Sequence, residues 1–291
     1  MRSSGNVIGK DRESLSSQAE KQECNPCYCK NSLFIVGLGP GNPQHLSEYA
    51  HHVLESVDSI VGYSTYIELI RDHFPGKHFV QSSMKKEIER VNAAIELAVE
   101  GKSTAIVSSG DAGIYAMAGL AFELCRKKKI RIQESGIGSQ ETALRLEVVP
   151  GIPALCAGAS LLGAPLTHDF AVISLSDLLT PWEVIERRIE AAAIADFVIV
   201  FYNPKSKKRN WQLKKAVEII LKHRSKDTPV GIVTSAMRED QNVVITMLGN
   251  TDVEQVNMQS IVFVGNKTTF MYQNYMVTPR GYSDKYDMGD E

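Results

Sequence analysis

Short apolar runs alternate with longer amphipathic segments along most of the chain. Residues 33–36 form a continuous apolar run, which predicts a buried strand. Between Leu46 and Val57 the apolar residues recur at helical spacing, which predicts a helix with one buried face. Residues 58–61 then form the next strand-like segment. The order of these segments predicts a βαβ unit, the building block of a parallel sheet.

The same alternation continues up to residue 162. We predict further helices over residues 63–73, 85–99, 116–126 and 155–162, and further strands over residues 78–80, 104–107 and 144–149. The segment Gly163-Ala164-Pro165-Leu166-Thr167 interrupts the pattern with glycine and proline, and it predicts a domain boundary.

A second α/β set follows this boundary. Strands are predicted over residues 171–175, 197–201, 230–233, 243–248 and 261–264, and helices over residues 181–193 and 210–223. Thr180 is expected to cap the first of these helices in a capping box with Glu183. The fold class is therefore predicted as α/β, with two consecutive domains over residues 31–165 and 166–282.

Composition limits the classes of partner. The 291 residues are 43% hydrophobic, and Lys+Arg 32 nearly balance Asp+Glu 34, so no overall field favours nucleic acid or an acidic membrane. The longest apolar runs fall far short of the roughly 20 residues that span a bilayer. The N-terminus has no apolar signal core. We expect a cytoplasmic protein with no nucleic-acid or membrane partner.

Both ends of the chain are polar. Residues 1–30 and 283–291 are predicted as tails, the first disordered because it is rich in Ser, Glu, Lys and Gln. Cys24, Cys27 and Cys29 give this tail a C-x-x-C-x-C cluster, which could hold zinc or part of an iron–sulfur cluster if a fourth ligand joined them. A tail without a metal is the alternative. Cys125 and Cys156 lie in apolar helical segments, where buried thiols are expected.

Three strand ends run into loops of glycine and proline. They are Gly37-Leu38-Gly39-Pro40-Gly41, Ser109-Gly110-Asp111-Ala112-Gly113 and Pro150-Gly151-Ile152-Pro153-Ala154, the first, second and third loops. Glycine permits unusual dihedral angles and close approach of a ligand, and an aspartate can accept hydrogen bonds. Because ligands bind at the carboxyl ends of strands in open α/β sheets, we expect these loops to converge on one ligand.

The first loop also resembles part of a dinucleotide fingerprint. Gly37 and Gly39 fit the first two glycines of G-x-G-x-x-G, and Asp58 lies where a ribose-binding acid would be expected. Asn42 occupies the third glycine position, and Pro40 lacks an amide hydrogen. A nicotinamide-dependent reductase is therefore an alternative prediction.

The three loops, in this order, resemble those of the tetrapyrrole methylases, a two-domain family that binds S-adenosylmethionine between its domains. The segments His168–Trp182 and Phe201–Arg209 add a resemblance to the members that methylate C17 of corrin precursors. The similarity covers about residues 33 to 282. Ala112 stands where the family commonly has proline, and Pro153 where it often has serine.

The resemblance implies a methyltransferase of corrin metabolism. It would transfer a methyl group from S-adenosylmethionine to C17 of precorrin-3B or cobalt-factor III, with ring contraction, in cobalamin biosynthesis, and it would act as a homodimer. The implied cofactor-binding residues are Pro40, Gly110, Asp111, Ile114, Pro153, Ala154, Tyr202 and Ala236. Methylation of another ring carbon, of diphthine or of ribosomal RNA, and a non-catalytic ligand sensor, are alternatives.

The substrate of such an enzyme carries many carboxylates, and these favour cationic partners. The densest basic cluster comprises Lys205, Lys207, Lys208, Arg209, Lys214 and Lys215. A solvated loop and helix face is the alternative interpretation. The expected substrate-binding residues are His168, Asp169, Asn203, Lys205, Lys207 and Arg209. Methyl transfer depends chiefly on positioning, so no catalytic acid or base is assigned.

Overall fold

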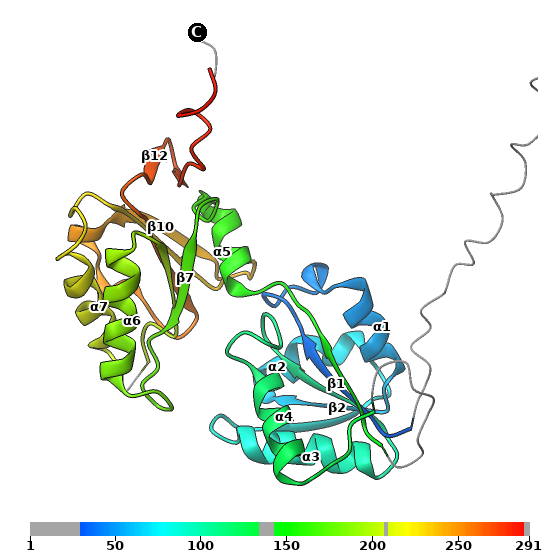
Figure 1. Cartoon of the computed structure of the whole chain (residues 1–291). Coiled ribbons are helices and arrows are strands. Elements are labelled where there is room, and N and C mark those ends of the chain that lie inside the picture. The colour runs from blue at the N-terminus through cyan, green and yellow to red at the C-terminus, as the bar shows by residue number, and fades with distance from the viewer. Residues whose placement is uncertain (1–29, 134–142, 207–208, 288–291) are drawn as a thin grey trace, which may run out of the picture.

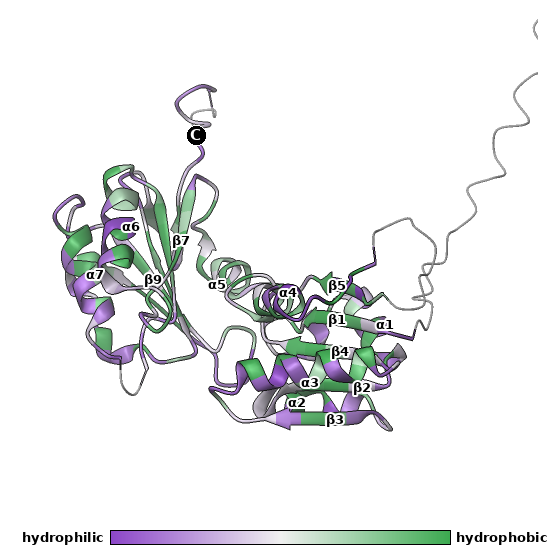
Figure 2. Ribbon diagram, turned by 60° about the horizontal axis from the view of Figure 1, so that its bottom comes forward, coloured by the Kyte–Doolittle hydropathy of each residue, from purple (hydrophilic) through white to green (hydrophobic). Residues whose placement is uncertain are grey.

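A computed structural model describes residues 30–133, 143–206 and 209–287 and contains two α/β domains, each built on a five-stranded sheet (Figure 1). The two sheets follow one another along the chain, as the pattern of strands and helices predicts. Figure 2 shows that the strands of both sheets are mainly hydrophobic, whereas the covering helices alternate between hydrophobic and hydrophilic residues.

The N-terminal sheet is entirely parallel. Its strands are β1 (Ser32–Gly37), β2 (Ser59–Tyr63), β3 (His78–Ser82), β4 (Ser103–Ser108) and β5 (Arg145–Val149), in the order β3-β2-β4-β1-β5. Helices α1 (Glu48–Ser56), α2 (Ser64–Ile70), α3 (Glu87–Val99) and α4 (Met117–Lys127) connect them. Phe34 packs into the core with α1 and α2, and Ile35 into the core with α3 and α4. Burial of both faces explains the continuous apolar run in β1.

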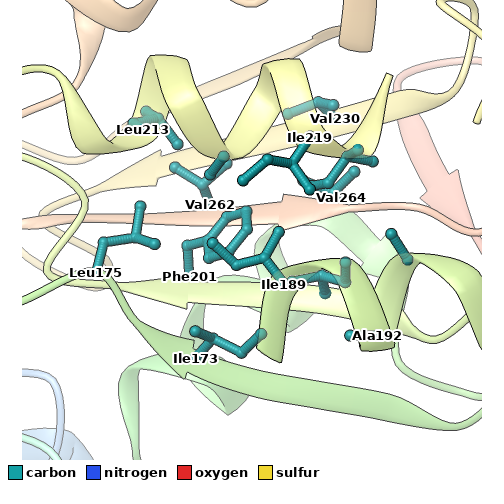
Figure 3. Packing of buried hydrophobic residues seen from close by; sticks show 14 of the residues in the cluster. Ile173, Leu175, Ile189, Ala192, Phe201, Leu213, Ile219, Val230, Val262 and Val264 are labelled. Carbon is teal, nitrogen blue, oxygen red and sulfur yellow. The ribbon is translucent and has the colours of Figure 1, made fainter. Parts of the chain in front are cut away.

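The C-terminal sheet is mixed. Its strands are β7 (Phe170–Ser174), β8 (Val198–Tyr202), β9 (Pro229–Thr234), β10 (Asn242–Met247) and β11 (Ser260–Val264), in the order β10-β9-β11-β8-β7. Only the β7–β8 pairing in this sheet is parallel. Helices α6 (Trp182–Ile194) and α7 (Gln212–Ile220) cover one face. Figure 3 shows the core beneath them, where Ile189 and Leu213 pack around Phe201 and Val262.

Helix α5 (Ala154–Leu162) covers the other face of the C-terminal sheet. A Cβ on Gly231 would lie 2.4 Å from Leu162 Cδ1, and one on Gly158 would lie 2.8 Å from Phe263 Cε2. Helix and sheet are therefore in direct contact. The chain passes from the first sheet to the second at residues 150–153, one helix before the boundary expected after residue 165. The helix is visible in the local sequence, but the sheet that it covers is not.

A small third sheet was not predicted. It consists of β6 (Gly163–Ala164), β12 (Phe270–Tyr272) and β13 (Tyr275–Val277), with the order β12-β13-β6. Met276 of β13 is fully buried against the α5 face of the C-terminal sheet. Strands this short carry too few residues to reveal a periodic pattern. Four short 3-10 helices complete the described elements: η1 (Pro43–His45), η2 (Arg71–His73), η3 (Leu248–Asn250) and η4 (Val253–Gln255).

The other strands and helices agree with the predicted ones to within a few residues, but two local predictions were wrong. Helix α6 has Pro181 as its N-cap and no side-chain capping bond, so Thr180 and Glu183 do not form the expected capping box. Cys125 is buried as expected, but Cys156 is exposed on the first turn of α5.

Cys24, Cys27 and Cys29 lie outside the described residues. Within residues 30–133, 143–206 and 209–287, no cluster of His, Cys, Asp and Glu is suited to a metal ion. In the same ranges, no helix has both the length and the apolar character needed to cross a bilayer.

Candidate active site

The three glycine loops meet through direct backbone contact. Gly39 N donates to Gly110 O over 3.0 Å, and Gly110 N donates to Gly39 O over 2.7 Å. A Cβ on Gly37 would lie 2.6 Å from Gly110 O, and one on Gly151 would lie 2.3 Å from the same oxygen. Side chains at these glycines would occupy the space of a neighbouring loop. The predicted convergence of the three loops is therefore present.

Asp111 holds two of these loops together. Its Oδ1 accepts a hydrogen bond from Gly113 N at 2.8 Å within the second loop. Its Oδ2 accepts one from Gly151 N in the third loop at 3.1 Å. Each carboxylate oxygen has a second lone pair, so these bonds leave acceptor capacity for a ligand.

Tyr202 brings the C-terminal domain to the same place. Its hydroxyl accepts a hydrogen bond from Leu155 N in the first turn of α5, at 3.0 Å. Burial raises the pKa of Tyr202 to about 12, although the hydrogen bond from Leu155 acts in the opposite direction. The phenol therefore stays protonated near neutral pH, and its hydrogen remains a potential donor to a ligand.

Tyr115, two residues after the second loop, reaches the C-terminal domain, although the sequence assigned it no role. Its hydroxyl donates to Val172 O in β7 over 3.2 Å. Its ring centroid lies 5.3 Å from that of Tyr202. Desolvation raises the pKa of Tyr115, so this hydroxyl too remains a donor near neutral pH. The two aromatic rings therefore pack against each other where the domains meet.

The residues expected to bind the cofactor are gathered at this junction. Ile114, Ala154, Tyr202 and Ala236 belong to one apolar cluster that draws on both domains. Pro40 is buried in the first loop, and a Cβ on Gly110 would lie 3.7 Å from Pro153 Cα. The expected cofactor-binding residues thus lie on loops, at the end of β8 and at the start of α5, where these elements meet between the two sheets.

The expected substrate residues lie at two different edges of the C-terminal sheet. Strands β7 and β8 are parallel, with Phe170 opposite Val198 and Ser174 opposite Tyr202. Asn203 and Lys205 therefore follow the end of β8 that faces the junction. His168 and Asp169 precede β7 and lie at the other edge, where His168 Nδ1 accepts a hydrogen bond from Asp169 N at 2.8 Å. The structure does not bring these two pairs together.

Arg209 and Lys205 already have partners within the protein. Arg209 is 7% exposed, and its guanidinium donates to Ser176 Oγ at 2.8 Å and to Asn203 O at 3.1 Å. Burial lowers its pKa, and the charge of Asp177 opposes that shift. Lys205 Nζ pairs with Glu254 Oε2 at 2.7 Å. Lys207 lies outside the described residues.

Asp58 lies at the wrong edge of the N-terminal sheet for a ribose-binding acid. It precedes β2, whereas the first loop follows the carboxyl end of β1. Its Oδ2 accepts hydrogen bonds from both Ser103 N and Ser103 Oγ at 2.8 Å. Asp58, the residue that favoured a nicotinamide cofactor, therefore connects the start of β2 to the start of β4.

A cavity of about 300 Å³ lies within the N-terminal domain, beside the first loop. Its lining is mainly apolar and consists of Leu38, Gly41, Pro43, Gln44, Leu46, His51, Leu69, Ile70, His73 and Phe74. This lining comes from the N-terminal domain alone and includes Leu38 and Gly41 of the first loop.

Residues 32–252 match the model of the Tetrapyrrole (Corrin/Porphyrin) Methylases. The chain therefore belongs to this family, and its enzyme class is that of S-adenosylmethionine-dependent methyltransferases. The family and enzyme class inferred from the three loops are confirmed.

Individual relatives are similar over most of the chain. A probable cobalt-factor III C(17)-methyltransferase of Salmonella typhimurium is 47% identical over 86% of this chain and 99% of its own length. A cobalt-factor III methyltransferase of Priestia megaterium is 47% identical over 89% of this chain, which spans 46% of that protein. The crystal structure of the methyltransferase CobJ is 32% identical, with a TM-score of 0.78 over 86% of this chain and 100% of that one.

Proposed function

We propose that this chain transfers a methyl group from S-adenosylmethionine to C17 of precorrin-3B or cobalt-factor III, with ring contraction, in cobalamin biosynthesis. The observation that carries the proposal is the 47% identity with the Salmonella relative, which extends over 99% of that protein. The junction between the sheets supports it, because three glycine loops and Tyr202 converge there.

The junction has the chemistry that S-adenosylmethionine requires. The apolar cluster of Ile114, Ala154 and Ala236 suits an adenosyl group, and Tyr115 and Tyr202 add aromatic faces beside it. Asp111 supplies an acceptor for hydroxyl or ammonium donors. When bound, S-adenosylmethionine supplies an electrophilic methyl group on a sulfonium.

The residues of this chain act mainly by positioning. Convergent backbone from the three loops would fix the methyl donor. The loop after β8, which carries Asn203, would face the tetrapyrrole that accepts the methyl group. Bringing two reactants together in the right orientation removes much of the entropic barrier to their reaction. Contacts between the domains, such as that of Tyr115 with Val172, would exclude water from the site.

The proposed substrate loop follows β8. Asn203, Lys205 and Lys207 would meet the carboxylates of the macrocycle, while Arg209 would hold the loop through Ser176 and Asn203. His168 and Asp169 lie outside the proposed site, because they are at the opposite edge of the sheet. We further propose a cytoplasmic location and, from the family resemblance, a homodimer, which analytical ultracentrifugation would test.

Two measurements on the purified chain test this function. Calorimetry should give a heat of binding with S-adenosylhomocysteine and none with NAD. Incubation with methyl-labelled S-adenosylmethionine and cobalt-factor III or precorrin-3B should transfer label to the macrocycle. Binding of NAD alone would refute the proposal, and binding of S-adenosylhomocysteine without label transfer to either macrocycle would refute its substrate.

A further inference from the structure

Arg238 of the C-terminal domain reaches the first and second loops of the N-terminal domain. It lies between β9 and β10, and its Nε donates to Pro40 O over 2.7 Å. Its Nη2 donates to Ser109 Oγ over 3.3 Å. We propose that Arg238 is a positioning residue that fixes these loops against the C-terminal domain and thereby strengthens binding of the methyl donor. This inference rests on the proposed function.

The loop that carries Arg238 is held in an unusual conformation. Ser235 and Met237 have φ values of 51° and 60°, in the left-handed region that few residues other than glycine adopt. Ser235 Oγ lies 2.8 Å from Asp240 Oδ2, and Met237 N donates to Gln241 Oε1 over 2.9 Å. Backbone strain of this kind persists where the surroundings stabilise it, and it clusters at functional sites. These bonds direct the Arg238 side chain toward the junction.

The first loop leaves room for the guanidinium. A Cβ on Gly41 would lie 2.6 Å from Arg238 Nε and 3.0 Å from its Cζ. Tyr66 of α2 is also within its electrostatic reach: burial raises the Tyr66 pKa, and the charge of Arg238 opposes that shift. The guanidinium is thus surrounded by the N-terminal domain although it comes from the C-terminal one.

The two groups that Arg238 contacts lie directly beside the proposed donor site. Pro40 is one of the expected cofactor-binding residues, and Ser109 precedes Gly110 and Asp111. A hydrogen bond to the Pro40 carbonyl fixes the orientation of that peptide. Groups that are ordered before a ligand arrives lose less entropy when it binds, so removing Arg238 should weaken affinity more than stability.

The test compares Arg238→Gln and Arg238→Lys with Arg187→Gln, which removes one exposed charge from α6. Calorimetry with S-adenosylhomocysteine should show a dissociation constant raised about tenfold or more by Arg238→Gln, since bonds from a charged donor are lost. The dissociation constant of Arg238→Lys should lie between those of the wild type and Arg238→Gln, because lysine keeps the charge but lacks the planar guanidinium. Arg187→Gln should match the wild type, and all melting temperatures should lie within a few degrees.

Gly41→Ala provides an internal check. Alanine at position 41 is strained by the backbone φ of 124° whether residue 238 is Arg or Gln, whereas the clash with Nε occurs only when Arg238 is present. The effect of Gly41→Ala on affinity should therefore be smaller in the Arg238→Gln background than in the wild type, which is the signature of coupled residues.

Small-angle scattering tests the contact without any ligand. Ligand-free Arg238→Gln should have a larger radius of gyration than the wild type and Arg187→Gln, because the domains are less restrained. If the wild type bound no S-adenosylhomocysteine, the proposed function would fail, and scattering would decide only whether Arg238 fixes the loops against the C-terminal domain. If the wild type bound it and Arg238→Gln had the same affinity and radius, the inference would be overturned while the function stood.

Discussion

Asp111 Oδ2 accepts a hydrogen bond from the backbone N–H of Gly151, 40 positions further along the chain. The bond joins the loop after β4 to the loop after β5, at the point where the chain leaves the N-terminal sheet. One carboxylate therefore contributes both to the arrangement of the domains and to the proposed donor site.

Replacing Asp111 with Ala should lower both the stability of the protein and its affinity for the methyl donor. Loss of the carboxylate leaves Gly113 N and Gly151 N without this partner. The free energy of unfolding should therefore fall by about 1–3 kcal/mol. The dissociation constant for S-adenosylhomocysteine should rise by about tenfold or more for the same reason. Calorimetry and denaturant unfolding measure the two effects. Asp227→Ala, at an exposed turn, is the control, and unchanged affinity in Asp111→Ala would remove Asp111 from the site.

Tyr202 gives the stability a dependence on alkaline pH. Its folded pKa of about 12 lies above the ordinary value of 10, so the folded state holds the phenolic proton more tightly than the unfolded state. The stability associated with this group is complete below pH 10 and is lost as the pH rises toward 12. The difference in unfolding free energy between the wild type and Tyr202→Phe should shrink over this window. A constant difference would show that the Tyr202 pKa is not raised.

Replacing Lys205 and Lys207 should weaken binding of the macrocycle but not binding of the methyl donor. Gln at both positions should raise the Michaelis constant for the tetrapyrrole several-fold at low ionic strength, since exposed ion pairs contribute about 0.2–1 kcal/mol each. The effect should diminish as salt screens the wild-type contacts. Steady-state kinetics at two salt concentrations measure it, with Lys214→Gln and Lys215→Gln as the matched control. An unchanged constant at low salt would identify a solvated surface.

Arg209 was grouped with these lysines in the sequence, but its burial predicts a different outcome. Arg209→Gln should lower the unfolding free energy by about 1–3 kcal/mol, because Ser176 Oγ and Asn203 O lose a charged donor. Denaturant unfolding measures this change. A variant as stable as the wild type, with a raised Michaelis constant, would instead place Arg209 on the substrate.

Deleting residues 1–30 tests whether the predicted cysteine-containing tail contributes to stability. The deletion should change the melting temperature by no more than a few degrees, because the described core begins at β1. Metal analysis of the full chain and of the deletion should agree. Iron or zinc found only in the full chain, together with a fall in stability or activity, would show that Cys24, Cys27 and Cys29 form a metal site.

Local signals explain why much of the fold was predictable. The run Leu33-Phe34-Ile35-Val36 followed by Gly37 announces a buried strand and a tight turn within a few residues. The convergence of the three loops then follows from the polarity of parallel strands. Helix α5 was also found, but the sheet beneath it depends on Phe263 and Gly231, far along the chain.

Contacts between distant segments explain what the sequence did not reveal. Tyr115 and Arg238 look ordinary in their local sequence, and their partners Val172 and Pro40 are 57 and 198 positions away. Arg209 lies beside lysines in the sequence, yet its burial depends on Ser176, 33 positions earlier. Residues of this kind become visible only when the fold brings segments that are distant in the sequence together.

The position of the new methyl group tests the central claim most directly. Cobalt-factor III should be incubated with the purified chain and S-adenosylmethionine labelled with carbon-13 in its methyl group, and the product examined by nuclear magnetic resonance. Our account predicts one labelled methyl group, attached to C17 of a contracted ring. A label on another ring carbon, or no label although S-adenosylhomocysteine binds, would contradict it.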